Sequence, residues 1–93
     1  DRKGVMSEKG ISDGFSKAIK QGCKAVIIDF DMHMSNREIK YREVAKRLIW
    51  RYDDFESKRI VRCYIIKNKK AIYLEKHQLD KNILVDLLKK LEP

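Results

Sequence analysis

The chain contains few residues that interrupt helices or strands. Among its 93 residues there are four glycines and one proline, Pro93, which stands at the last position. The hydrophobic fraction of 43% is too high for a disordered chain. A chain of 93 residues suffices for one domain and not for two, so we expect a single folded domain over residues 11–93.

Cysteines and metal-ligand motifs are scarce as well. Cys23 and Cys63 lie beside or within apolar stretches, and neither belongs to a CxxC or Cys/His cluster with zinc spacing. We interpret both as small buried hydrophobic residues, and we expect no disulfide framework, no metal and no cofactor. Asp29-Phe30-Asp31 is similar to the opening motif of haloacid-dehalogenase-type phosphatases, but the longer chain and further motifs of that family are missing.

Long apolar runs are also missing. No stretch approaches the roughly 18 apolar residues that cross a membrane, and no signal-peptide pattern opens the sequence. We therefore expect no membrane partner and a site of action in the cytoplasm, where the cysteines stay reduced. The first residue is Asp1 and not Met, so we expect the chain to be an excised or processed part of a longer product.

Positive charge is what the sequence has in excess. Twenty-two Lys and Arg residues against fourteen Asp and Glu residues give a formal net charge of +8. Such a surface favours a phosphate polymer, an anionic membrane or an acidic protein as its partner. We take RNA as the leading hypothesis, and a basic surface that only keeps the chain soluble is the alternative.

Apolar spacing divides the chain into helices and strands. Helical spacing predicts three helices, over residues 12–22, over residues 35–52 and from residue 80 onward. We expect Ser12 to cap the first helix and Gly22 to end it as a C′ glycine, a capping box at Ser35–Glu38 to begin the second, and Asp80 to cap the third. Runs of β-branched residues predict three strands, over residues 25–30, 60–66 and 71–75, the last two joined by a tight turn. Residues 1–10 lack periodicity, and we expect them to form a mobile segment.

This order of elements predicts an α+β fold. The strand–helix–strand unit is long enough for a parallel crossover, and the hairpin that follows adds an antiparallel strand. We expect a small mixed β-sheet packed with about three helices.

Basic residues are predicted to gather along the middle helix and on the hairpin. At roughly 100° per residue, Lys40, Arg47 and Arg51 fall on one flank of the apolar stripe, where they could follow a phosphate backbone. The alternative is a solvated helix face that Glu38 and Glu43 partly neutralise. On the hairpin, strand alternation puts Arg62 and Tyr64 on one face, and we expect Tyr73 to approach them from the neighbouring strand. We expect cations and aromatic rings here to bind RNA together through phosphates and unpaired bases; these residues are Arg62, Tyr64, Lys67, Lys70 and Tyr73. The alternative is that both tyrosines are ordinary sheet aromatics.

His33 and His77 are the only histidines. Cleavage of RNA without a metal needs a base for the 2′-hydroxyl, an acid for the leaving oxygen and cations for the transition state. A neutral imidazole can act as the base near pH 7. We therefore predict His33 and His77 as the catalytic candidates, with surface histidines as the alternative.

One segment resembles a known family. From Ala18 to Asp29, a helix that ends in Lys-Gln-Gly is followed directly by an apolar strand that ends in Asp. This pattern resembles the C-terminal tRNase domains of CdiA-type contact-dependent inhibition toxins. It is also similar to nuclease domains attached to phage head proteins, within the barnase/colicin/RelE-like group. The resemblance covers roughly residues 11–75, by pattern more than by identity.

The resemblance implies a ribonuclease that cleaves RNA, commonly tRNA, without a metal. It also implies an acidic immunity or antitoxin protein that masks the basic face, and a delivered toxin or phage-associated nuclease as the origin. Such domains carry a Glu-x-Lys strand before the first matching helix, whereas here Glu8 and Lys9 are adjacent. No catalytic residue is therefore transferred by motif. A non-catalytic nucleic-acid-binding module and a protein-interaction module remain the alternative functions.

Overall fold

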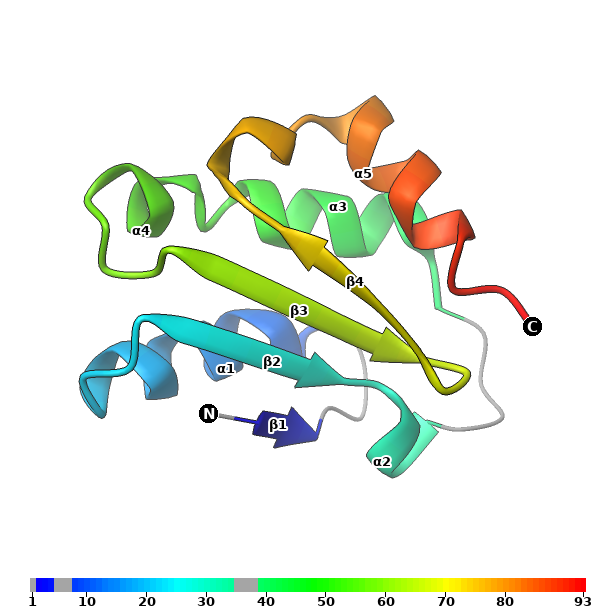
Figure 1. Ribbon diagram of the computed structural model, residues 1–93, viewed down its shortest axis with the longest axis horizontal. Coiled ribbons are helices and arrows are strands. Elements are labelled where there is room, and N and C mark those ends of the chain that lie inside the picture. The colour runs from blue at the N-terminus through cyan, green and yellow to red at the C-terminus, as the bar shows by residue number, and fades with distance from the viewer. Residues whose placement is uncertain (1, 5–7, 35–38) are drawn as a thin grey trace.

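A four-stranded sheet is the centre of the molecule, in a computed structural model that describes residues 2–4, 8–34 and 39–93 (Figure 1). Its strands lie side by side in chain order: β1 (Arg2–Gly4), β2 (Ala25–Asp29), β3 (Arg62–Lys67) and β4 (Lys70–Leu74). The first three strands pair in parallel, and β4 pairs antiparallel with β3. The predicted crossover from β2 to β3 and the predicted hairpin are both confirmed.

Helices connect the strands and cover one face of the sheet (Figure 1). They are α1 (Gly10–Lys20), α2 (Asp31–Met34), α3 (Tyr41–Ile49), α4 (Tyr52–Glu56) and α5 (Lys81–Lys89), with a 3₁₀ turn, η1 (Lys76–Gln78), before the last. α1 packs on β2, and α5 packs on α3. The predicted α+β class with a small mixed sheet is confirmed.

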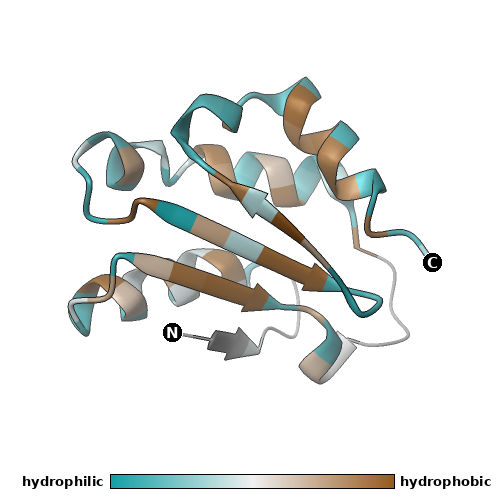
Figure 2. Ribbon diagram, viewed as in Figure 1, coloured by the Kyte–Doolittle hydropathy of each residue, from teal (hydrophilic) through white to brown (hydrophobic). Residues whose placement is uncertain are grey.

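Strand alternation separates a buried face from an uncovered one. Residues that face the helices are at most 8% exposed: Val26, Ile28, Cys63, Ile65, Ile72 and Leu74. They join Phe15 of α1, Leu48 of α3 and Leu84 of α5 in one hydrophobic core. The alternate residues are half-buried or exposed, and we call the surface that they form the open face: Ala25, Ile27, Arg62, Tyr64, Ile66, Ala71 and Tyr73. Figure 2 shows hydrophobic residues along much of β2 and a hydrophilic β3–β4 turn.

Two helix boundaries differ from the prediction. α1 starts at Gly10, so Ser12 lies inside the helix and does not cap it; its Oγ instead accepts a hydrogen bond of 3.2 Å from Nη1 of Arg51. The predicted C′ role of Gly22 is confirmed, because Gly22 has φ +77° and closes a Schellman motif. The predicted middle helix is divided into α3 and α4 by Arg51, whose backbone leaves the helical region at φ −98° and ψ 14°. Its expected capping box at Ser35–Glu38 lies outside the described residues.

The N-terminal segment also differs from the loop that we expected. Arg2–Gly4 forms β1, which pairs with residues 27–29 of β2. Because this strand is only three residues long and flanks the sheet, its sequence carries too short a pattern to be read as a strand.

A carboxylate of the β2–α2 connection holds the β3–β4 turn. Asn68 and Lys69 have φ values of 54° and 61°, which are those of a two-residue type I′ turn. The backbone N–H groups of both residues donate to the carboxylate of Asp31, at 2.7 and 2.8 Å. Consecutive N–H groups in such a turn form an anion-binding concavity, and here an internal anion occupies it.

Replacing Asp31 with Ala should lower the free energy of unfolding by about 2 kcal/mol, because two charge-assisted hydrogen bonds are lost. Urea unfolding followed by circular dichroism measures the change. Asp86→Ala removes an exposed carboxylate from α5 and serves as the control, with an expected change within about 0.5 kcal/mol. Equal effects of the two substitutions would contradict the role of Asp31.

Candidate nucleic-acid interface

Two tyrosines lie side by side on the open face. Tyr64 of β3 and Tyr73 of β4 are register partners, and their ring centroids are 5.2 Å apart at an interplanar angle of 46°. Ile27 of β2 is the next register partner in the same row. Tyr73 is 39% exposed, and no described helix covers this face, so we call the pair the aromatic platform. The sequence prediction that Tyr73 approaches Tyr64 is confirmed.

Charged side chains flank the aromatic platform. Arg62 precedes Tyr64 by two residues on the same face, as predicted, and its charge acts on the phenol of Tyr73. Partial desolvation and a hydrogen bond with the carboxylate of Glu75 raise the pKa of Tyr73, whereas Arg62 opposes this shift. Tyr73 therefore keeps its proton as a donor to Glu75, and its ring remains on the surface.

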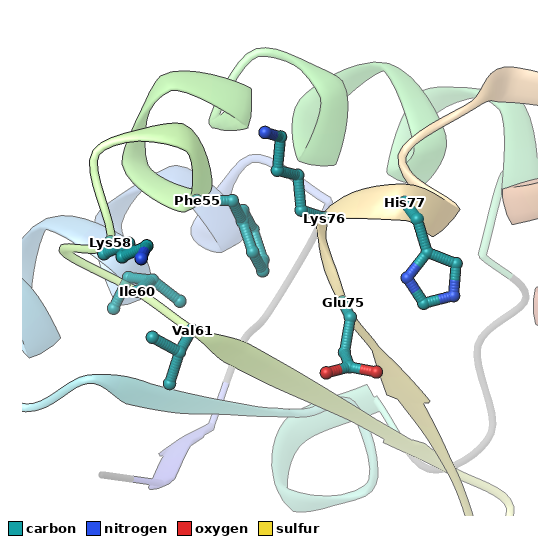
Figure 3. Close-up of a pocket in the computed structure, with 7 residues that line it drawn as sticks. All are labelled: Phe55, Lys58, Ile60, Val61, Glu75, Lys76 and His77. Carbon is teal, nitrogen blue, oxygen red and sulfur yellow. The ribbon is translucent and has the colours of Figure 1, made fainter.

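A cavity of about 650 Å³ adjoins the platform at the end of the sheet where β3 begins and β4 ends. We call it the end pocket, and it is lined by Phe55, Lys58, Ile60, Val61, Glu75, Lys76 and His77. Figure 3 shows Phe55, Lys58, Ile60 and Val61 on one side of it, and Glu75 and His77 on the other. Glu75 follows Tyr73 by two residues, so β4 connects the platform to the end pocket.

Basic residues gather around the end pocket. Lys24, Lys58 and Arg62 are exposed, and the carbonyl of Lys24 accepts a hydrogen bond of 2.7 Å from the N–H of Val61. Lys76 forms an ion pair with Glu56, and this contact lowers the pKa of Glu56 and raises that of Lys76. The ion pair fixes η1 against α4 and occupies the charge of Lys76, while the exposed Lys24, Lys58 and Arg62 add positive charge at this end of the sheet.

The predicted ridge on the middle helix is not a row of available cations. Lys40 is exposed at the start of α3, but Arg47 pairs with Glu43 at 3.0 Å and lies over the ring of Trp50. Arg51 pairs with Asp54 at 2.6 Å, and its side chain is only 19% exposed. Its guanidinium thus links α1 to α4, which is a structural role.

The lysines of the hairpin also divide into two groups. Lys67 was predicted to contact RNA, but it is 5% exposed and lies on the face that the helices cover. Lys70 is exposed, and its Nζ donates a hydrogen bond of 2.6 Å to the carbonyl of Glu92. Lys70 therefore remains at the surface, at the end of the sheet opposite to the end pocket.

The two histidines belong to opposite ends of the sheet. His33 is in α2, which follows the C-terminal end of β2, whereas His77 is in η1, which follows the antiparallel strand β4. At about 3.3 Å per strand residue, their backbones are on the order of 15 Å or more apart. The structure therefore does not bring them together as one acid–base pair. His77 lines the end pocket and is the candidate that adjoins the platform.

The remaining reactive groups are occupied by structural contacts. Asp29 accepts hydrogen bonds from the N–H groups of Asp31 and Met32, and Asp31 binds the hairpin turn, so both carboxylates of this motif serve the fold. Within residues 2–4, 8–34 and 39–93, no three His, Cys, Asp or Glu side chains form a group suited to a metal ion. Both cysteines are free thiols, and burial raises the pKa of Cys63, which makes that thiol unreactive.

A second hollow lies between α3 and α5, about 470 Å³ in volume, and we call it the helix groove. It is lined by Arg42, Lys81, Asn82, Val85, Asp86 and Lys89. It lies apart from the aromatic platform, and its exposed residues Lys81 and Lys89 are suitable for control substitutions.

Apart from His77, the residues of the end pocket were not among the predicted site residues. Glu75 has the same strand parity as Tyr73, so alternation extended by two residues would have placed it on the open face. Lys58 and Val61 carried no such signal, because their position depends on how α4 packs against η1.

No family model, curated protein or solved structure matches this chain. Among the described helices, none combines the length and the apolar character that a membrane crossing requires.

Glu75→Gln should lower the pKa of Tyr73, because a neutral amide no longer repels the phenolate. Titration of the tyrosine ring carbons by NMR measures this pKa directly, and Tyr41 serves as the internal reference. An unchanged Tyr73 titration would show that Glu75 does not contact the platform in solution.

Proposed function

We propose that this domain binds unpaired RNA on the open face of its sheet. The observation that carries the proposal is the aromatic platform, in which Tyr64 and Tyr73 stand together on a surface that no described helix covers. Aromatic rings stack on bases of any sequence, and neighbouring cations hold the phosphates. Arg62 on the same face and Lys24 and Lys58 at its end supply that charge.

The charge distribution supports a contact with a polyanion on this side. Arg47, Arg51 and Arg59 are paired with acidic residues, so these three of the 22 basic side chains are not available to a polyanion. Arg62 is exposed beside the platform, and its charge acts on the phenol of Tyr73. Binding through Arg62 releases counterions from RNA and therefore weakens with salt.

Tyr64→Ala and Tyr73→Ala should each weaken the binding of an unstructured oligoribonucleotide about tenfold, which corresponds to roughly 1.4 kcal/mol of lost stacking. Tyr→Phe substitutions keep the rings and should change affinity less than threefold. Arg62→Ala should reduce the slope of log affinity against log salt by about 0.7, the value for one phosphate contact on a single strand. Fluorescence anisotropy at several salt concentrations measures both effects.

Lys89→Ala in the helix groove is the matched control and should leave affinity nearly unchanged. Loss of binding in this variant, with full binding by the tyrosine variants, would place the RNA on the helix layer and overturn the proposal.

RNA cleavage is a second candidate function. His77 lines a pocket that adjoins the platform, together with the carboxylate of Glu75 and the cation of Lys58. The resemblance to CdiA-type tRNase domains favours tRNA as the substrate and an acidic immunity protein as a partner. β1 precedes α1, as the Glu-x-Lys strand does in those domains, and it contains Lys3 but no glutamate.

Incubation with total tRNA in the presence of EDTA should yield discrete fragments on a denaturing gel. His77→Ala should slow cleavage about a hundredfold, the effect of removing a general acid or base. Full activity of His77→Ala with inactive Lys3→Ala would move the reaction to β1. Intact tRNA with the unsubstituted chain would leave the domain as a binding module.

A further inference from the structure

We infer that the end pocket takes up a single nucleotide of the RNA strand, with its base against the apolar wall and its phosphate at the basic rim. This inference rests on the proposed function, because it names what lies next to the aromatic platform. It adds a defined binding site to a surface that would otherwise hold RNA by stacking and by phosphate contacts.

The wall of the end pocket suits a flat, apolar ligand. Phe55 and Ile60 are 4% and 0% exposed and form the base of the hollow, while Val61 is 39% exposed at its entrance. Because Val61 is exposed beside the cavity, its apolar surface is available for contact with a ligand. The volume of about 650 Å³ is in the range of roughly 300–1,000 Å³ that small-molecule sites occupy.

The rim of the end pocket suits a phosphate. Lys58 and His77 are exposed on opposite sides of the hollow (Figure 3), and the ion pair with Glu56 holds Lys76 away from it. Glu75, the one carboxylate that lines the pocket, bonds with Tyr73, so it turns toward the platform. A base on Tyr73 and a second nucleotide in the end pocket would be two strand residues apart, about 7 Å.

Lys58 holds its place at the rim in an unfavourable backbone conformation. Its φ is 61°, in the left-handed region that glycine favours at the end of a helix, and it follows α4 directly. Its N–H donates to the carbonyl of Phe55 at 3.1 Å, and the N–H of Ile60 donates to that of Asp54 at 3.0 Å. Glycine would satisfy the same turn with less strain, whereas lysine adds a cation at the pocket. Strained residues of this kind cluster at binding sites.

The test is an NMR titration of the ¹⁵N-labelled chain with adenosine 5′-monophosphate, adenosine and inorganic phosphate as separate probes. The nucleotide should shift the amides of Ile60, Val61, Lys76 and His77 in a saturable manner and bind at least fivefold more tightly than either part alone. Equal affinity for inorganic phosphate would reduce the site to an anion site and overturn the inference. Shifts confined to the helix groove would overturn it as well.

Two substitutions separate binding from folding. Val61→Glu adds bulk and negative charge at the entrance and should abolish nucleotide binding. Lys58→Gly should weaken it at least fivefold while raising the midpoint of thermal unfolding, because the turn is relieved of strain. A more stable variant cannot lose the ligand through misfolding. Undiminished nucleotide affinity in Lys58→Gly would contradict the phosphate contact, and Lys89→Ala is the charge-matched control.

The outcome for the end pocket is distinguishable from that for the platform. An oligoribonucleotide that shifts the ring resonances of Tyr64 and Tyr73, but not the amides of Val61 and His77, would overturn the pocket and leave RNA binding intact. An oligoribonucleotide that shifts neither set would overturn both.

Discussion

The contact between the Asp31 carboxylate and the turn of the hairpin is the constraint on which the candidate site depends. β4 is an edge strand that pairs with β3, so its register is set by that pairing and by the turn. This register places Tyr73 opposite Tyr64 and Glu75 beside the end pocket. A slip of one residue would turn both side chains toward the helices. The Asp31 carboxylate, which follows β2, thus helps to position the ring of Tyr73 on β4.

The one-sided covering of the sheet explains why net charge alone was a poor guide to the candidate interface. Arg51 and Lys67 both contribute to the charge of +8. Arg51, however, links α1 to α4, and Lys67 is buried on the face that the helices cover. Among the side chains that the structure describes, the cations near the open face come from the ends of strands and helices. Arg62 and Lys58 matter because of where the fold places them.

Local patterns in the sequence predicted the central features of the fold and half of the site. Strand alternation put Arg62 and Tyr64 on one face, and the turn residues predicted the hairpin, because both depend on neighbours in the chain. The end pocket, the break at Arg51 and the use of Asp31 as a turn anchor depend on contacts between distant segments. No periodicity reports such contacts. The pairing of the ridge residues Arg47 and Arg51 is local, because their acidic partners Glu43 and Asp54 are four and three residues away, and apolar periodicity does not show which cations are paired.

The open face also couples the stability of the domain to its surroundings. Ile27 and Ile66 are only half-buried on the open face, and the platform beside them is in contact with water. The native state therefore leaves apolar surface exposed to water that a second layer of helices would have buried. Any molecule that occupies this face binds the folded chain and not the unfolded one. By mass action, such a ligand shifts the folding equilibrium in proportion to the logarithm of its concentration once the face is saturated. The uncovered side of the sheet therefore makes the population of folded molecules a function of ligand supply.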